Sequence, residues 1–312
     1  MAKGIFVIGS ANVDFILRIP RFHKPGETIT GEDMTTAFGG KGANQAIAAK
    51  RLGGEVTFLA AMGEDAHGKA YRKYLVQSGF KREFLLADPK SPTGIALIEI
   101  IPEGENRIIV SPGANRALSS LHLKKASKVW EGARVFVAQL ETPLETVQAG
   151  LEMARRKGVL TILNPAPGRP LSSRILANVD FLVPNETEAQ EITGKRIKSG
   201  EDLPKAALEL LRRGVKNVVI TLGEKGVFFK NRYVEIRVEA FRVKPVDTTA
   251  AGDAFVGALA WGLAERREIE DVLIHANAAG ALTATRLGAQ PSLPTMAGVK
   301  KFLRNRKSVA KD

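Results

Sequence analysis

The chain has 312 residues, 44% of them hydrophobic and 25% charged, with no cysteine and a formal net charge of +13. This composition is typical of a soluble globular protein with a substantial core, in one large domain with an appendage or in two modest domains. The lack of cysteine excludes disulfide bonds, thiol nucleophiles and sulfur-ligated zinc sites. No run approaches the ~18 apolar residues of a membrane span, so we expect a cytoplasmic protein.

The first element is an apolar run over residues 5–17. It could suggest a signal peptide, but Asn12 and Asp14 interrupt it and no small-residue cleavage site follows. We therefore interpret it as a buried strand.

Short apolar runs then alternate with amphipathic segments along most of the chain. Strands are predicted at residues 5–9, 56–61, 135–140, 159–163, 180–184 and 217–222. Helices are predicted at residues 43–52, 144–156, 186–192 and 203–213. This alternation indicates an α/β fold with a doubly wound, mainly parallel sheet flanked by helices.

Two segments, residues 15–31 and 93–110, contain Gly and Pro turns and no helix, and the second predicts a hairpin around residues 102–106. We expect them to pair into a small sheet, either a lid over a ligand site or a decoration of the domain edge. The predicted β lid comprises residues 13–34 and 93–111, and the α/β domain comprises residues 1–12, 35–92 and 112–312.

Polar residues and glycines follow several of the predicted strands. Because ligands of doubly wound sheets bind beyond the carboxyl ends of the strands, these residues would gather at one edge. Each alone suits a loop or a helix cap, but together they could bind hydroxyls, metals or phosphates. They are Asn12, Asp14, Glu141, Asn185, Gly223, Lys225 and Gly226.

Residues 38–49, FGGKGANQAIAA, place a glycine-rich turn before a predicted helix. Their spacing matches neither G-x-x-x-x-G-K-[ST] nor G-x-G-x-x-G, so neither of these nucleotide loops is predicted. The Gly backbone, the Lys41 ammonium and the Asn44 amide would suit a polyhydroxylated ligand. The alternative is a glycine-rich helix entrance without a ligand.

Residues 185–188, NETE, place the Asn185 amide and the Glu188 carboxylate three residues apart, on one side of the first turn of a helix. These oxygens could hold a hydrated Mg²⁺ ion, which needs one or two protein ligands besides phosphates and waters. A capping box is the alternative, because Asn followed by Glu three residues later is its usual form.

Residues 248–255, TTAAGDAF, form a small-residue turn that opens an apolar helix with Asp253 in its first turn. Such a turn can bind an anion such as phosphate, because its backbone N–H groups are unpaired and lie at the positive end of the helix dipole. The alternative is that Asp253 only caps the helix.

The positive net charge raises the possibility of nucleic-acid binding. Basic residues cluster only in the C-terminal tail, and no aromatic residues interleave with them to stack on bases. We therefore expect no nucleic-acid partner and interpret the tail as a solvated helix. Its basic residues are Lys300, Lys301, Arg304, Arg306, Lys307 and Lys311.

Eight segments resemble, in order and spacing, the motifs of the ribokinase branch of the PfkB carbohydrate kinase family. They are GSANVD (9–14), AFGGKGANQA (37–46), QLE (139–141), NPAP (164–167), PNETE (184–188), TLGEKG (221–226), DTTAAGDAF (247–255) and TRLGAQPS (285–292). The resemblance covers essentially the whole chain. It implies ATP-dependent phosphorylation of ribose at its 5-hydroxyl, with Mg²⁺ and an activating K⁺ ion, and a homodimer formed through the β lid.

The resemblance also implies roles for single residues. Asp253 resembles the general base, beside an anion hole formed by Ala250, Ala251 and Gly252. The implied sugar contacts are Asn12, Asp14, Gly40, Lys41, Asn44 and Glu141, together with Asp253. The implied nucleotide contacts are Asn185, Thr221, Gly223, Gly226, Gly252 and Asn277, and Glu188 resembles the residue that organises Mg²⁺ through water. The implied potassium site comprises Asp247, Thr249, Thr283, Arg286, Gly288 and Ser292.

Val256 departs from the Asn that many ribokinases carry at this position. Fructose, a ketodeoxy sugar acid or a nucleoside are therefore alternative acceptors, but the matched segments contain neither an additional Arg for an acid nor an aromatic side chain for a nucleoside. A sugar-binding regulator without catalysis is a further alternative, and the intact Gly252 and Asp253 argue against it.

Overall fold

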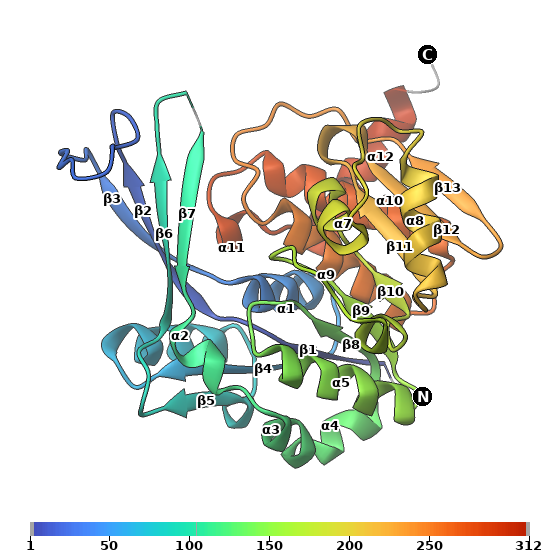
Figure 1. Cartoon of the computed structure of the whole chain (residues 1–312), viewed down its shortest axis with the longest axis horizontal. Helices are drawn as coiled ribbons and strands as arrows, with labels where there is room; N and C mark the ends of the chain where they lie inside the picture. Colours follow the sequence, from blue (N-terminus) through green and yellow to red (C-terminus); the bar gives the residue numbers. More distant parts are fainter. Residues whose placement is uncertain (1–2, 104, 310–312) are drawn as a thin grey trace.

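A nine-stranded sheet forms the centre of the molecule (Figure 1). The computed structural model describes residues 3–103 and 105–309. The strands of this sheet are β1 (Gly4–Ile8), β4 (Val56–Gly63), β5 (Leu85–Asp88), β8 (Ala133–Ala138), β9 (Leu160–Leu163), β10 (Phe181–Leu182), β11 (Asn217–Thr221), β12 (Val227–Asn231) and β13 (Glu235–Val238). Their order is β13-β12-β11-β10-β9-β8-β1-β4-β5, with β12 and β13 antiparallel at one edge and all other neighbours parallel. The predicted α/β fold is confirmed.

Side chains of β1 enter two separate cores on the two faces of this sheet. Ile5 and Val7 belong to one core, and Phe6 and Ile8 belong to the other. A strand covered on both faces is apolar at every position, which explains why β1 reads as a continuous apolar run.

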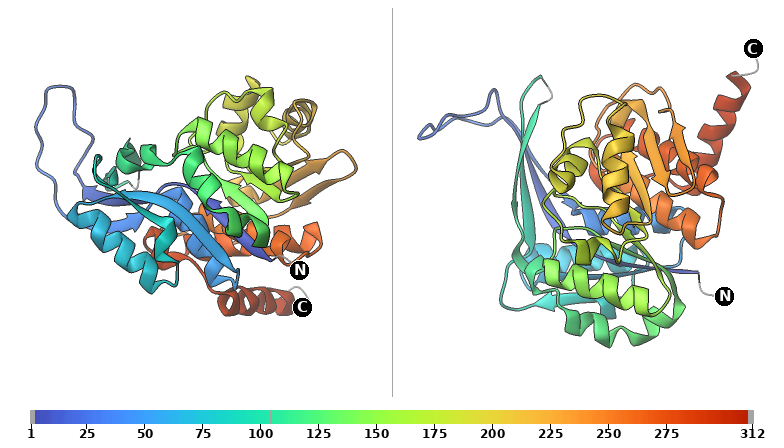
Figure 2. Two further views of the ribbon diagram at one scale, coloured as in Figure 1. Left: turned by 90° about the horizontal axis from the view of Figure 1, so that it is seen from below. Right: turned by 45° about the vertical axis from the view of Figure 1, so that its right-hand side comes forward.

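Helices cover both faces of the sheet (Figures 1 and 2). On the side of Ile5 and Val7 lie α1 (Lys41–Arg51), α2 (Ala66–Gln77), α9 (Ala251–Ala264), α10 (Ile269–Ala284) and α12 (Met296–Val309). On the other side lie α3 (Ser120–Lys125), α4 (Ser127–Gly132), α5 (Leu144–Arg156), α6 (Ser173–Leu176), α7 (Glu186–Thr193) and α8 (Leu203–Arg212). The shorter elements are α11 (Ala289–Ser292) and the 3₁₀ turns η1 (Arg82–Phe84), η2 (Gly113–Ala117) and η3 (Gly223–Lys225).

A separate four-stranded sheet projects along one side of the molecule (Figure 2). It consists of β2 (Asn12–Arg18), β3 (Met34–Gly39), β6 (Gly94–Ile100) and β7 (Asn106–Ser111), in the order β3-β2-β6-β7. The predicted hairpin is present, because β6 and β7 pair in antiparallel fashion up to Ile100 and Asn106. Residue 104, inside the predicted turn, lies outside the described residues.

The small sheet differs from the sequence-based expectation in two respects. Strand β3 belongs to the small sheet, whereas the proposed boundary began the α/β domain at residue 35. The first residues of β3, Met34 to Thr36, are exposed, so they carry no apolar pattern that predicts a strand. The apolar run of residues 5–17 forms two strands rather than one, because the chain leaves the large sheet after Ile8 and enters the small sheet at Asn12.

The basic tail continues α12 as far as Val309, and residues 310–312 lie outside the described residues. Over residues 3–103 and 105–309, no helix has the length and apolar character needed to cross a membrane.

Candidate active site

The carboxylate of Asp253 lies at the start of α9 and is buried against the start of α1. Its two oxygens accept hydrogen bonds from Asn44 Nδ2 and Gln45 Nε2, each 2.9 Å long. The N-cap residue of α9 is Ala250, and within the described structure no side chain caps this helix by a hydrogen bond. The capping interpretation of Asp253 is therefore wrong, because amides of another helix hold this carboxylate.

The close crossing of α1 and α9 brings these side chains together. A Cβ on Gly257 would lie 2.6 Å from Ala48 Cβ and 2.8 Å from the backbone oxygen of Gln45, so only glycine allows this approach. The side chain of Gln45 is itself held, since its Oε1 accepts from Gln139 Nε2 at 2.6 Å and its Nε2 also donates to Asn164 Oδ1 at 3.0 Å. Residues after β8 and β9 therefore orient the amide that binds the carboxylate.

The turn that opens α9 has open space beside it, and of its backbone N–H groups that of Ala251 donates to the backbone oxygen of Thr248 at 3.2 Å. Ala250 adopts a left-handed conformation with φ 61°, which is uncommon for a residue with a side chain. A Cβ on Gly252 would meet no other atom within 4 Å. Because the first N–H groups of a helix lack intrahelical acceptors and carry the positive end of the dipole, this turn can receive an anion beside Asp253.

Asn12 and Asp14 lie at the start of β2, where the small sheet leaves the large one. Asn12 Oδ1 accepts from Asn115 Nδ2 at 2.7 Å, and Asn115 Oδ1 accepts from the N–H of Ala11 at 2.9 Å. A Cβ on Gly39, in the neighbouring strand β3, would lie only 2.0 Å from Asp14 Oδ2. Both polar side chains are buried and positioned by close neighbours.

The glycine-rich turn before α1 meets a carboxylate from the loop after β8. Gly40 is the N-cap residue of α1 and has a left-handed φ of 90°. Glu141 Oε2 accepts from the N–H of Lys41 at 3.1 Å and from the hydroxyl of Ser10. Ser10 Oγ in turn accepts from the N–H of Gly42 at 3.3 Å. These contacts join the loops after β1 and β8 to the start of α1.

Asn185 and Glu188 form a capping box at the start of α7. Asn185 Oδ1 accepts from the N–H of Glu188 at 2.8 Å, and Glu188 Oε2 accepts from the N–H of Asn185 at 2.9 Å. The capping interpretation of this motif is confirmed. It does not exclude a role at a metal, because the cap uses only one carboxylate oxygen of Glu188.

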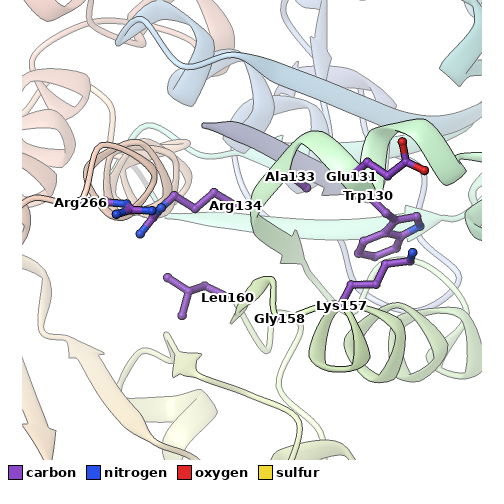
Figure 3. A pocket seen from close by; sticks show the side chains of 8 residues that line it. All are labelled: Trp130, Glu131, Ala133, Arg134, Lys157, Gly158, Leu160 and Arg266. Carbon is purple, nitrogen blue, oxygen red and sulfur yellow. The ribbon is translucent and has the colours of Figure 1, made fainter. Parts of the chain in front are cut away.

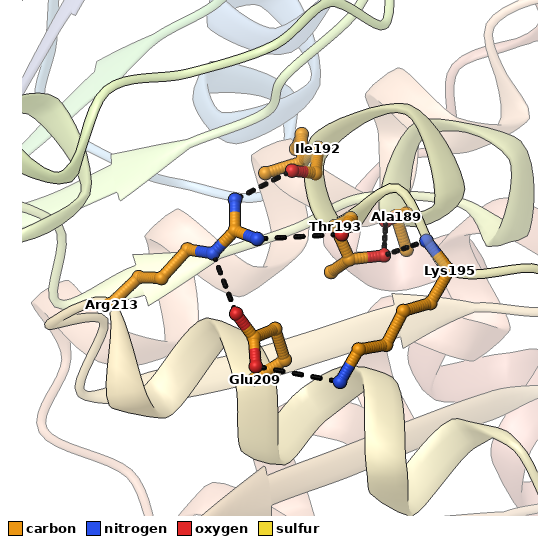
Figure 4. A network of polar contacts seen from close by, with 6 residues as sticks. All are labelled: Ala189, Ile192, Thr193, Lys195, Glu209 and Arg213. Carbon is orange, nitrogen blue, oxygen red and sulfur yellow. Dashed lines mark hydrogen bonds and ion pairs between the residues drawn. The ribbon is translucent and has the colours of Figure 1, made fainter.

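The opposite end of α7 is fixed to α8 by a polar network (Figure 4). Arg213 donates from Nη1 to the backbone oxygen of Ile192 at 2.8 Å and from Nε to Glu209 Oε1 at 2.9 Å. Glu209 Oε2 also lies 3.5 Å from Lys195 Nζ. These contacts fix the position of α7, and with it that of Glu188 in its first turn.

Most of the residues expected at a nucleotide lie at or just after the ends of β10 and β11. Thr221 forms an isolated parallel bridge with Asn185. Gly223 begins η3 with φ 57°, and Gly226 ends it with φ 98°. A Cβ on Gly226 would lie 2.0 Å from a backbone oxygen at the end of β13, so this glycine also serves packing. Asn277, on α10, donates from Nδ2 to a backbone oxygen just after β13 at 2.7 Å.

The residues expected at a potassium ion come from two segments that meet at Asp247. Its Oδ1 accepts from the N–H of Thr249 at 2.9 Å, and its Oδ2 accepts from the N–H of Gly288 at 2.8 Å. The other residues of this set, between the end of α10 and α11, are Thr283, Arg286 and Ser292.

Several residues of these networks were not predicted individually. Ser10, Gln45, Gln139 and Asn164 lie inside motif segments, where their polar character was the available signal. Asn115 lies outside every motif segment, so its contact with Asn12 follows only from the tertiary structure.

A family model described as pfkB family carbohydrate kinase matches residues 2–296. The chain belongs to the pfkB family of carbohydrate kinases. The sugar-kinase class expected from the motifs is confirmed.

Relatives of this chain are similar in sequence over nearly its full length. A ribokinase of Haemophilus influenzae is 38% identical over 303 residues, which are 97% of this chain and 99% of the relative. A deoxyribokinase of Salmonella typhi is 35% identical over 300 residues, with 96% and 98% covered. The solved structure of the Arabidopsis thaliana ribokinase complexed with ribose and ATP has a TM-score of 0.91 and 33% identity, and covers 97% of this chain and 99% of that one.

In this pfkB site, four carboxylates surround one ammonium. Burial alone would lower the pKa of Lys41, but the charges of Asp253, Glu141, Glu188 and Asp14 raise it above its ordinary value. Burial, followed by the charges of Glu141 and Asp253, raises the pKa of Asp14 to about 7. Burial likewise raises the pKa of Glu188. Negative charge is therefore in excess here.

The shifted pKa of Asp14 predicts a pH-dependent cost in stability. The unfolded chain releases this proton near pH 3.8 and the folded protein near pH 7, so the folded state binds more protons between these values and loses stability as pH rises. Asp14→Asn should therefore raise the free energy of unfolding at pH 8, by about 1–4 kcal/mol, and have much less effect at pH 5.

Urea unfolding of the wild type and the variant at both pH values measures this difference. Asp33→Asn removes an exposed carboxylate outside the site and is the matched control. An Asp14→Asn variant that is no more stable than the wild type at pH 8 would contradict the prediction.

Proposed function

We propose that the protein transfers the γ-phosphoryl group of ATP to the 5-hydroxyl of D-ribose and produces ribose 5-phosphate. The observation that carries the proposal is the position of Asp253, a buried carboxylate that two amides orient beside the open first turn of a helix. Support comes also from the similarity to named ribokinases and to a ribokinase complexed with ribose and ATP.

The sugar is proposed to bind between the start of β2 and the start of α1. Carboxylates and amides at this place accept and donate hydrogen bonds to hydroxyl groups, and their own hydrogen bonds fix their directions. The proposed contacts are Asn12, Asp14, Gly40, Lys41, Asn44, Glu141 and Asp253. The small sheet supplies Asn12 and Asp14, so it can close over the sugar as a lid and exclude water.

In the proposed mechanism, Asp253 accepts the proton of the attacking hydroxyl while the N–H groups of Ala250, Ala251 and Gly252 stabilise the transferred phosphoryl group. Phosphoryl transfer depends mainly on positioning and charge neutralisation. The hydrogen bonds from Asn44 and Gln45 hold both oxygens of Asp253, so the carboxylate is oriented before the sugar binds.

ATP is proposed to bind along the ends of β10 and β11, at Asn185, Thr221, Gly223, Gly226, Gly252 and Asn277. Mg²⁺ would be held through water by Glu188 and would supply positive charge to the phosphates. The excess of carboxylates around Lys41 fits a bound cation, and over the part of the chain that the structure describes no group of three or more His, Asp or Glu side chains could hold a metal. This agrees with a Mg²⁺ ion that takes most of its ligands from phosphates and water.

Potassium is proposed to bind beside the first turn of α9, at Asp247, Thr249, Thr283, Arg286, Gly288 and Ser292, in part through backbone oxygens. The hydrogen bonds of Asp247 to the N–H groups of Thr249 and Gly288 already join the two segments. A cation held there would add positive potential next to the anion hole.

Asp253→Asn tests the general base. The variant keeps the shape of the side chain but cannot accept the proton, so kcat with ribose and MgATP should fall by about 10²- to 10⁴-fold. Ribose binding measured by calorimetry, and thermal unfolding, separate lost chemistry from lost binding or folding. Turnover within threefold of the wild type would contradict the proposed role.

The similarity to a deoxyribokinase makes 2-deoxy-D-ribose the second candidate acceptor. A site whose buried polar groups bind the 2-hydroxyl loses at least one hydrogen bond with the deoxy sugar, so kcat/KM should be about tenfold or more higher for ribose. A coupled assay with both sugars, and with fructose, a ketodeoxy sugar acid and a nucleoside, decides between them. Equal or higher kcat/KM for the deoxy sugar would assign it as the substrate.

Removal of K⁺ from the same coupled assay should lower kcat.

We also propose that the protein forms a homodimer through its small sheet. Large apolar side chains are exposed on its edge strands, with Met34 61% exposed on β3 and Ile108 55%, Ile109 63% and Val110 44% exposed on β7. Light scattering should give a dimer for the wild type and a monomer for Ile109→Lys. A wild-type monomer at micromolar concentration would sink the proposal.

A further inference from the structure

A cavity of about 540 Å³ lies at the edge of the large sheet opposite to the proposed active site. Figure 3 shows the residues that line it. Its lining includes the first residues of β8 and β9, whereas the active-site groups follow the carboxyl ends of these strands. Its volume is within the range of sites for small ligands, about 300–1,000 Å³. The side chains that carry the argument are those of Trp130, Glu131, Arg134, Lys157, Leu160 and Arg266.

Two arginines of this cavity face one another. Arg134 extends from the start of β8 and Arg266 from the turn after α9, and Figure 3 shows their side chains approaching each other. Neither forms an ion pair or a side-chain hydrogen bond with any of the described residues, and the Nε atom of Arg134 is buried without a partner. Burial and the charge of Arg266 both lower the pKa of Arg134. The two like charges are therefore uncompensated.

The backbone at Arg266 adds an independent observation. Arg266 has a left-handed φ of 57° at the end of α9, a position usually occupied by glycine. The next residue, Arg267, is paired with Asp271 at 2.7 Å and lies over the ring of Trp261 at 4.6 Å. A strained backbone thus presents an unpaired guanidinium to the cavity, while its neighbour has ordinary structural contacts.

We propose that this cavity binds a phosphate group, alone or as part of a small phosphorylated molecule, between the guanidinium groups of Arg134 and Arg266. Guanidinium groups bind phosphate oxygens through paired, charge-assisted hydrogen bonds, and the buried Nε atom would gain the partner it lacks. The remainder of a larger ligand would extend toward Trp130, Glu131 and Lys157, which Figure 3 places on the other side of the cavity.

Calorimetric titration of the full chain with inorganic phosphate and with glycerol 3-phosphate tests the proposal. Arg134→Gln and Arg266→Gln should each weaken binding about tenfold or more, which corresponds to the loss of one hydrogen bond between charged groups. Arg266 is exposed, so its variant tests the site even if Arg134→Gln unfolds. Tighter binding of glycerol 3-phosphate than of phosphate would identify an organic ligand, and equal affinity would identify free phosphate.

Lys73→Gln is the matched control. Lys73 is exposed and lines a second basic cavity, of about 360 Å³, together with Lys69, Arg72 and Arg82. This control should leave the affinity within twofold of the wild type. Three outcomes would overturn the proposal. All three variants could weaken binding equally, or neither probe could bind at millimolar concentration. The two arginine variants could also bind like the wild type, which is expected if phosphate binds only at the start of α9.

Discussion

The hydrogen bonds from Asn44 and Gln45 to the two oxygens of Asp253 are the interaction on which the site depends. They join the N-terminal part of α1 to the first turn of α9, and the absence of a side chain at Gly257 allows the two helices to approach this closely. Through Gln45 the same network reaches the residues that follow β8 and β9. A carboxylate held in this way has one orientation before any ligand binds, which would lower the reorganisation needed for the proposed proton transfer.

Groups of like charge lie at two opposite edges of the large sheet. Carboxylates gather at the carboxyl ends of the strands and raise the pKa of both Asp14 and Lys41. Arg134 and Arg266, which have no ion-pair partner among the described residues, lie at the opposite edge. The repulsion between the carboxylates, and that between the two arginines, destabilises the empty protein, because like charges in a partly buried place repel one another. Such costs are typical of groups that are retained for ligands, here proposed to be a sugar with metal-bound ATP at one edge and a phosphate at the other.

Patterns that depend on neighbouring residues predicted the structure well. The helix predicted at residues 144–156 is α5 with the same bounds, because its apolar positions recur with a helical period. The motif NETE is a capping box, since its hydrogen bonds lie within one turn. Strand β3 was not predicted, because only its last residues are shielded from solvent and it owes its strand conformation to pairing with β2. The capping role first considered for Asp253 was wrong, since its partners lie about two hundred positions away in the sequence.

The sequence by itself determined the α/β class, the order of the motifs and the kinase family, because apolar periodicity and short motifs are local properties of the chain. Only the tertiary structure decided which amides hold Asp253 and that Asn115 positions Asn12. It also decided how the four carboxylates shift the pKa values of their neighbours, and that Arg134 lies near Arg266. Each of these facts depends on a distance between segments remote in the chain, and such distances are set by helix crossings and strand pairing rather than by the residues next to each group.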